Sequence, residues 1–153
     1  MLMHDHSNIL IDIPNARCTM PGVCSGGRPQ PHHFEAAREK GIRVVINLCP
    51  HHEPAGYDEE AVVTAMGMRY VNIPVAGPMD LTREKAQQLS AVLESCSHEH
   101  PALLHCGSGN RVGALLALKA YWLDGECAED ALKFGLESGL TMLEPVVRQH
   151  LGL

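Results

Sequence analysis

Apolar residues in this chain come in short runs separated by polar segments and turns. Val44 to Leu48 is a continuous, largely β-branched run, and Ala102 to His105 is a second short run, so both predict buried strands. Further strands are predicted over 9–13 and 68–75. Residues 14–30 contain three prolines and three glycines, and we expect them to be mostly loop or turn.

Helical spacing of apolar residues follows several of these strands. A helix is predicted from Pro31 to Gly41, because proline suits a first turn and glycine suits an end. A second helix begins in the acidic run 58–60, and Thr82 is suited to cap a third. Residues 112–123 are apolar nearly all round, which is typical of a buried helix. Two more helices are predicted over 127–138 and 142–151.

This order of elements predicts an α/β fold with a small central, largely parallel sheet flanked by helices. The 153 residues suit one domain with one core, and no internal repeat or long linker divides them. We therefore expect residues 1–153 to form a single domain, with 1–8 as a flexible tail.

Composition and charge argue against several classes of protein. The 12 basic and 18 acidic residues give a formal charge of −6 and no long basic run, which argues against nucleic-acid binding. No apolar stretch reaches the roughly 18–20 residues of a membrane span. The first residues lack the features of a signal peptide, so we expect a cytoplasmic protein whose six cysteines are free thiols.

The clearest chemical signal is the stretch from Leu103 to Gly113, where a buried strand leads through a glycine-rich turn into a helix. In open α/β sheets ligands bind at such turns, and the backbone N–H groups there favour an anion or a thiolate. Cys106 is therefore expected to be a nucleophile near neutral pH. Arg111 is placed to form a bidentate contact with a bound oxyanion. A structural cysteine would explain Cys106 alone, but not the whole constellation.

The run from His105 to Arg111 resembles the signature of the cysteine-dependent phosphatases, the tyrosine and dual-specificity superfamily. More closely, the chain is similar to the phosphatase-like domain of β-lactamase-hydrolase-like proteins and to the segment fused to some NAD kinases. Three stretches carry this resemblance, which covers most of residues 20–140: the run 108–114 (Ser-Gly-Asn-Arg-Val-Gly-Ala), the turn 25–29 (Ser-Gly-Gly-Arg-Pro) and the strand 41–48. The resemblance implies a dual-specificity-phosphatase-like fold.

The resemblance also implies a role for each residue of the loop. Cys106 would attack phosphorus and form a phosphocysteine, while His105 would orient the loop and favour the thiolate. The general acid would be an aspartate in the loop after the preceding strand, where Asp80 lies, although an aspartate before a helix is often only a cap. The phosphoryl oxygens would be bound by the loop Gly107, Ser108, Gly109, Asn110 and Arg111.

Two further residues are possible accessories to this site. Arg28 would reach the anion if the early turn lies beside the loop, and is otherwise a surface arginine. Cys49 follows a strand that would end near Cys106, so it is a candidate resolving thiol or an unreactive buried thiol. The histidine pairs lack the spacing of a helical zinc site, so we expect no metal and no cofactor.

The active loop also departs from the phosphatase pattern. Four residues separate Cys106 from Arg111 where the usual loop has five, and Val112 stands where Ser or Thr eases departure of the sulfur. The four-residue spacing resembles rhodanese-type sulfurtransferases, in which Cys106 would carry a persulfide. A third reading is a non-catalytic module that binds a phosphorylated ligand. The leading prediction is a phosphatase-type hydrolase acting on a small anionic or phosphorylated substrate, with no nucleic-acid or membrane partner and with an oligomeric state that the sequence leaves open.

Overall fold

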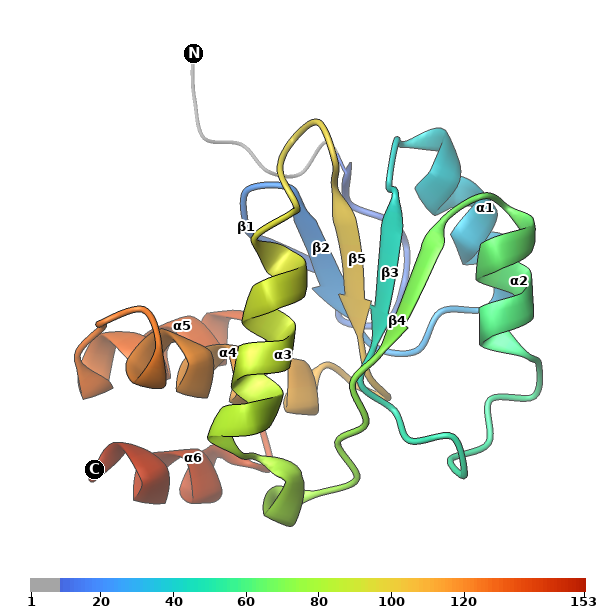
Figure 1. Ribbon diagram of the computed structural model, residues 1–153. Coiled ribbons are helices and arrows are strands. Elements are labelled where there is room, and N and C mark those ends of the chain that lie inside the picture. The colour runs from blue at the N-terminus through green and yellow to red at the C-terminus, as the bar shows by residue number, and fades with distance from the viewer. Residues whose placement is uncertain (1–8) are drawn as a thin grey trace.

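A largely parallel β-sheet forms the centre of the structure (Figure 1). The computed structural model describes residues 9–153, and within them five strands form one sheet in the order β1-β2-β5-β3-β4. β1 runs antiparallel to β2, and the other neighbours are parallel. The strands are β1 (Arg17–Met20), β2 (Val23–Gly26), β3 (Val44–Asn47), β4 (Arg69–Asn72) and β5 (Ala102–His105).

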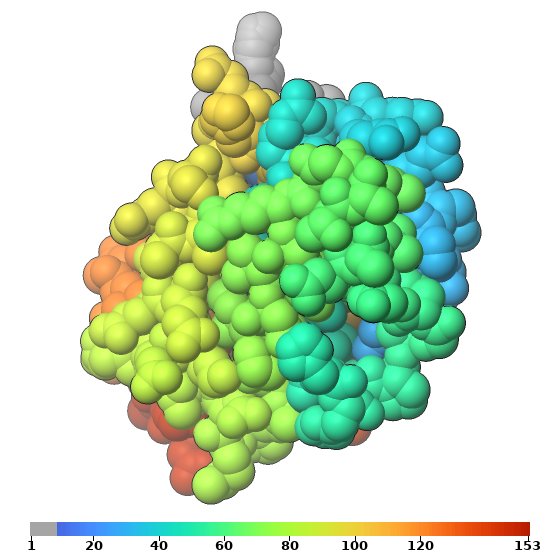
Figure 2. All heavy atoms as spheres, turned by 45° about the vertical axis from the view of Figure 1, so that its right-hand side comes forward, coloured from blue at the N-terminus to red at the C-terminus, as the bar shows by residue number. Residues whose placement is uncertain are grey.

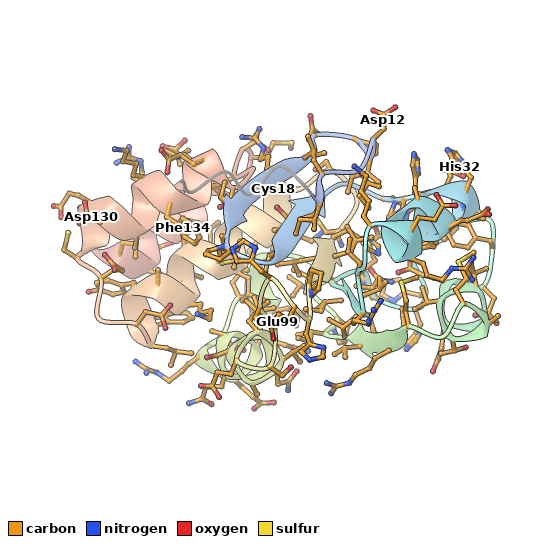
Figure 3. The ribbon with its side chains drawn as sticks, turned by 90° about the horizontal axis from the view of Figure 1, so that it is seen from above. Asp12, Cys18, His32, Glu99, Asp130 and Phe134 are labelled. Carbon is orange, nitrogen blue, oxygen red and sulfur yellow. The ribbon has the colours of Figure 1, made fainter. Side chains whose placement is uncertain are left out.

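Helices cover both faces of this sheet, which confirms the predicted fold class. α1 (Pro31–Glu39) and α2 (Glu59–Ala65) lie on one side. The other side carries α3 (Arg83–Leu93), α4 (Asn110–Trp122), α5 (Ala128–Glu137) and α6 (Glu144–Leu151). Seen from above, Asp130 and Phe134 of α5 lie at one end of the molecule and His32 of α1 at the other (Figure 3).

The two apolar cores follow from the alternation of side chains along the strands. Val44, Ile46 and Leu104 point into the larger core, together with most of α4. Val45 and Leu103 point the opposite way, into the core beneath α1 and α2. β5 is therefore buried on both faces, as its uniformly apolar sequence predicts.

Most of the predicted helix boundaries are confirmed within two or three residues. Pro31 begins α1, and the Thr82 hydroxyl caps α3 by accepting a hydrogen bond from the Lys85 amide at 3.2 Å. α4 is buried along almost its whole length. None of the helices within residues 9–153 is long and apolar enough to cross a membrane.

One prediction near the N-terminus is wrong and another is incomplete. Residues 9–13 form no strand; Ile9, Ile11 and Ile13 are buried, but they pack as an irregular segment against the core beneath α1. Slightly more than half of residues 14–30 are loop or turn, as predicted, but β1 and β2 also form a hairpin there, across the turn at Pro21 and Gly22. The tail expected over 1–8 lies outside the described residues.

Candidate active site

The carboxyl ends of β2, β3 and β5 meet at one edge of the sheet, and the Cys106 loop begins there (Figure 1). The loop runs from the end of β5 at His105 to Asn110, the first residue of α4. Gly109 closes it with a φ of +98°, a left-handed conformation that disfavours residues with a side chain. The sequence of the loop therefore fixes a tight turn that ends on a helix N-terminus.

Cys106 is completely buried at the start of this loop. Its Sγ accepts a hydrogen bond from the Gly109 amide at 3.1 Å, and its own amide donates to the Gly26 carbonyl at 3.2 Å. An N–H aimed at sulfur from the start of a helix stabilises a thiolate more than a thiol. The geometry at Cys106 thus has the features that a nucleophilic thiolate requires.

The early turn after β2 lies directly against the loop, as the sequence resemblance implies. The Arg28 amide donates to the Gly107 carbonyl at 3.0 Å. A Cβ atom on Gly27 would lie 2.7 Å from that same carbonyl oxygen, so only glycine allows this approach. The Asn15 side chain adds a further contact, donating from Nδ2 to the Ser108 carbonyl at 2.8 Å. These contacts join the N-terminal hairpin to the loop.

Arg111 faces Glu53, a residue that the sequence analysis did not select. The two Nη atoms of Arg111 donate to the two carboxylate oxygens of Glu53, each at 2.8 Å. Nη1 also donates to the Val75 carbonyl at 2.9 Å, and Nη2 lies 3.8 Å from Cys49 Sγ. The paired hydrogen bonds that Arg111 donates to Glu53 lower the pKa of the Glu53 carboxyl group and raise the pKa of Arg111.

His105 forms a second polar contact beneath the loop. Its Nε2 atom lies 2.6 Å from Glu59 Oε2, and its Nδ1 atom lies 3.2 Å from the Cys106 carbonyl oxygen. Both ring nitrogens therefore face an oxygen atom of the protein. Asn47 Nδ2 faces the other Glu59 oxygen at 3.4 Å. This arrangement fixes the orientation of the ring beside the Cys106 peptide.

Cys49 is buried at the end of β3, near Arg111. Burial raises the pKa of its thiol to about 12, against smaller opposing effects of Arg28 and Arg111. The Cys49 amide donates to Asn47 Oδ1 at 2.8 Å, which fixes the backbone where the strand ends. At neutral pH Cys49 is therefore a protonated thiol.

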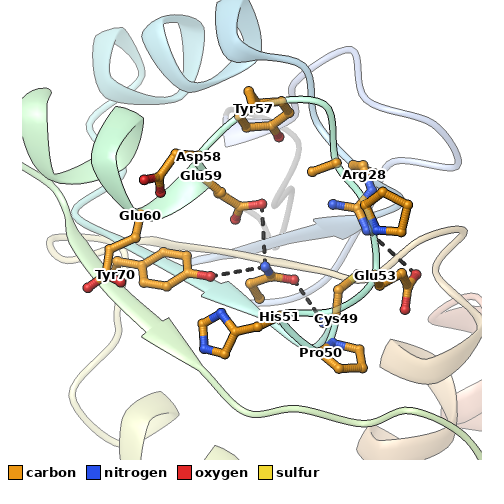
Figure 4. A pocket seen from close by; sticks show the side chains of 13 residues that line it. Arg28, Cys49, Pro50, His51, Glu53, Tyr57, Asp58, Glu59, Glu60 and Tyr70 are labelled. Carbon is orange, nitrogen blue, oxygen red and sulfur yellow. Dashed lines mark hydrogen bonds and ion pairs between the residues drawn. The ribbon is translucent and has the colours of Figure 1, made fainter.

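A cavity of about 230 Å³ opens beside the loop, between the segment after β3 and α2 (Figure 4). Figure 2 shows the surface hollowed between the teal residues of that segment and the neighbouring green ones. Cys49, Arg28 and Glu53 form the wall nearest the loop, and Tyr57 and Tyr70 line other parts. The Tyr57 hydroxyl donates to the Pro29 carbonyl at 2.5 Å, and burial raises the pKa of both tyrosines.

Two of the predicted site residues form side-chain hydrogen bonds with residues outside the Cys106 loop. The Asp80 carboxylate accepts a hydrogen bond from the Ala76 amide at 2.8 Å, within the loop that follows β4. The Asn110 side chain accepts hydrogen bonds from the amides of Thr141 and Leu143 at 2.9 and 3.1 Å, so it anchors the start of α6.

Within residues 9–153, no group of three or more histidine, cysteine or acidic residues is arranged to hold a metal ion.

Sequence reasoning missed the two acidic residues of this site, Glu53 and Glu59. Both lie far from Cys106 in the chain, in a loop and a first helical turn that contain several acidic residues. The acidic start of α2 was interpreted only as a match to the helix dipole. No spacing rule links Glu59 to His105, because the contact depends on how α2 packs over β3 and β5.

Comparisons with known proteins agree with this geometry. Residues 22–121 match the family described as the phosphatase-like domain of β-lactamase hydrolase-like protein. No curated protein gives a match. Among solved structures, a candidate phosphatase (DUF442) from Shewanella putrefaciens CN-32 is 23% identical, over 92% of this chain and 93% of that chain, with a TM-score of 0.69.

Two further solved structures share the fold at lower identity. A candidate phosphatase from Neisseria meningitidis Z2491 is 14% identical over 93% of this chain and 97% of that chain, with a TM-score of 0.69. TpbA from P. aeruginosa, solved in complex with pTyr, is 15% identical over 97% of this chain and 99% of that chain, with a TM-score of 0.61. The fold is therefore that of the cysteine-based phosphatases.

Proposed function

The chain belongs to the family of the phosphatase-like domain of β-lactamase hydrolase-like proteins, and from that premise we propose that it hydrolyses phosphomonoesters with Cys106 as nucleophile. The observation that carries the proposal is the 3.1 Å hydrogen bond from the Gly109 amide to Cys106 Sγ at the start of α4. It supports a thiolate aimed into a loop whose remaining amides and Arg111 can bind oxyanions.

In the proposed reaction the Cys106 thiolate attacks phosphorus and the bond to the ester oxygen breaks. The leaving oxygen takes a proton from a general acid, for which Asp80 is the candidate. Water then attacks the phosphocysteine, the sulfur–phosphorus bond breaks, and phosphate leaves with the thiolate restored. Arg111 and the loop amides stabilise the charge that develops on the phosphoryl oxygens in both steps.

His105 would act on this reaction through the loop rather than on the substrate. Its ring lies between Glu59 and the Cys106 carbonyl, so it is a positioning residue for the nucleophile's peptide. Arg28 is a second cation at the site. Cys49 is a neighbouring thiol, and the proposed reaction does not need it as a nucleophile.

A second candidate function is sulfur transfer of the rhodanese type. The observation that favours it is the loop length, because only four residues separate Cys106 from Arg111, and Val112 follows. In this reaction Cys106 attacks the outer sulfur of thiosulfate, the sulfur–sulfur bond breaks and sulfite leaves. Cyanide or a thiol then takes the outer sulfur from the Cys106 persulfide, and the thiolate is restored. No general acid and no hydroxyl after the arginine are needed.

Intact mass spectrometry distinguishes the two reactions. The reduced protein is exposed to thiosulfate and, separately, to an aryl phosphate, with Cys106→Ser as the control. A phosphoryl adduct or phenol release that requires Cys106 supports the phosphatase, and Asp80→Asn should then slow phenol release. A sulfur-sized adduct that requires Cys106, without phenol release, overturns the phosphatase in favour of sulfur transfer. No adduct with either reagent supports a module that only binds anions.

A further inference from the structure

Two arginine side chains meet on a single carboxylate at the edge of the active loop. Glu53 Oε1 lies 2.8 Å from Nη2 of Arg111 and 3.5 Å from Nη2 of Arg28. Figure 4 shows the Arg28–Glu53 ion pair at the wall of the cavity. Two guanidinium groups around one oxygen are the arrangement that proteins use to bind phosphate and related oxyanions.

This carboxylate also lies beside the loop itself. A Cβ atom on Gly107 would be 3.6 Å from Glu53 Oε1 and 2.9 Å from Arg111 Nη2. The Arg28 backbone is tied to the same residue through its hydrogen bond to the Gly107 carbonyl. Glu53 thus occupies the space where loop, Arg28 and Arg111 converge.

The hydrogen atoms on the two Nη atoms of Arg111 are all directed at protein acceptors. Nη1 donates to Glu53 and to the Val75 carbonyl, and Nη2 donates to Glu53 and faces Cys49 Sγ. An arginine has only five N–H donors. A ligand oxyanion can therefore accept a bidentate pair of hydrogen bonds from the two Nη atoms only by replacing Glu53.

We propose that Glu53 is a built-in competitor for an anion site formed by Arg28 and Arg111, and that an oxyanion bound there must displace it. The inference rests on the proposed function in one respect, that the ligand's anionic group lies at the Cys106 loop. Glu53 can leave, because it lies in an irregular loop and 31% of its side chain is exposed. The neighbouring cavity then receives the rest of the ligand.

The charge of the ligand determines which anions can displace Glu53. A monovalent anion that replaces Glu53 exchanges one negative charge for another against the same two guanidinium groups, and the net gain is small. A divalent anion such as a phosphomonoester or thiosulfate adds a second charge to the contact. The free energy needed to displace Glu53 is the same for every ligand. Only a ligand whose interaction with the two guanidinium groups exceeds this free energy binds well.

Calorimetric titration of the protein with sulfate and with nitrate tests this inference without any turnover. Glu53→Gln keeps the size of the side chain and removes its charge, so it should bind sulfate about tenfold more tightly than the wild type, which corresponds to the strength of a charge-assisted pair. Because the penalty is uniform, nitrate should gain by the same factor. Asp124→Asn, which removes a similar carboxylate from the Lys119 ion pair, should change neither affinity.

The second arginine needs its own variant. In the Glu53→Gln background, Arg28→Ala should weaken sulfate binding, whereas Arg43→Ala at the opposite end of β3 should not. Sulfate binding by Glu53→Gln that is weaker than, or within twofold of, the wild type would mean that Glu53 positions Arg111 and does not compete. Unchanged sulfate binding by the Arg28→Ala double variant would remove Arg28 from the site. Thermal melts establish first that each variant is folded, and Glu53→Ala, which also removes the charge, serves if Glu53→Gln is not.

These outcomes are separate from the test of the proposed function. Tighter sulfate binding by Glu53→Gln in a protein that releases no phenol overturns the phosphatase and supports the competitor. Phenol release that requires Cys106, together with no gain in sulfate affinity on Glu53→Gln, supports the phosphatase and overturns the competitor.

Discussion

The Nε2 atom of His105 lies 2.6 Å from Oε2 of Glu59, and both side chains are buried. The pair joins α2 to the end of β5, directly before Cys106. Removal of one partner of a buried hydrogen bond leaves the other polar group without a partner and away from water. Glu59 should therefore matter to the fold and to the loop at the same time.

Glu59→Ala is expected to lower the free energy of unfolding by about 1–3 kcal/mol, because His105 keeps its burial and loses its partner. Urea unfolding at neutral pH measures this difference. Glu94→Ala, at the exposed end of α3, is the matched control and should change stability by less than about 0.5 kcal/mol. A loss below about 1 kcal/mol for Glu59→Ala would contradict the role of the pair.

Gly113→Ala tests how closely α4 packs on the segment before α6. Alanine at a helical position normally adds about 1 kcal/mol of stability over glycine. A Cβ atom at Gly113, however, would lie 2.2 Å from the Leu140 amide nitrogen and 2.7 Å from the Gly135 carbonyl oxygen, both of which are backbone atoms. We expect the clash to outweigh the propensity, with a net loss of about 2 kcal/mol or more.

Thermal unfolding of Gly113→Ala is compared with Gln88→Ala, on the exposed side of α3. The control should melt at or slightly above the wild-type temperature, since alanine is the better helix former. A melting temperature for Gly113→Ala equal to or above that of the wild type would show that the two segments separate easily.

Glu53 should make stability depend on pH. Its pKa in the folded protein is lowered from 4.5 by the hydrogen bonds from Arg111, so its contribution is present above the unfolded value and is lost as the pH falls through the folded value. The wild type should be more stable than Glu53→Gln by about 0.5–1 kcal/mol at neutral pH. The two proteins should converge as the pH falls below the folded value. A gap in urea unfolding that stays constant with pH would contradict this assignment.

Cys49 should resist alkylation in the folded protein. Burial raises its pKa to about 12, so the reactive thiolate is scarce at neutral pH. Exposed Cys127 is the internal control. Iodoacetamide at neutral pH, followed by peptide mapping, should label Cys127 at least about a hundredfold faster than Cys49. Equal labelling would restore Cys49 as a candidate resolving thiol for Cys106.

The parts of the fold that follow from local sequence were predictable. β3 and β5 are apolar up to their last residue, and α4 is apolar nearly all round after its first turn, so their burial could be inferred directly. β1 and β2 contain polar side chains and, in β2, a glycine, so no apolar run marks them. β2 pairs with β5 and β1 pairs with β2, so their strand conformation is a tertiary effect.

In the candidate site, too, the residues close together in sequence were predictable and those brought together by packing were not. Cys106, Arg111 and the glycines lie in one stretch, so their spacing indicated an anion-binding loop. Glu53 comes from a different segment, and its contact with Arg111 exists only because the carboxyl ends of β3 and β5 are neighbours. A sequence pattern cannot rank one acidic residue of a loop above another, whereas packing can.

The position of β5 in the sheet has a consequence for the order in which the protein folds during synthesis. β5 separates β2 from β3, yet it follows both of them in the chain by more than fifty residues. Until residue 105 has left the ribosome, the two halves of the sheet have no common neighbour and their inner edges are unpaired. Cys106 directly follows the strand that completes the sheet. Its thiol therefore acquires the hydrogen bond from the Gly109 amide only once the sheet is assembled.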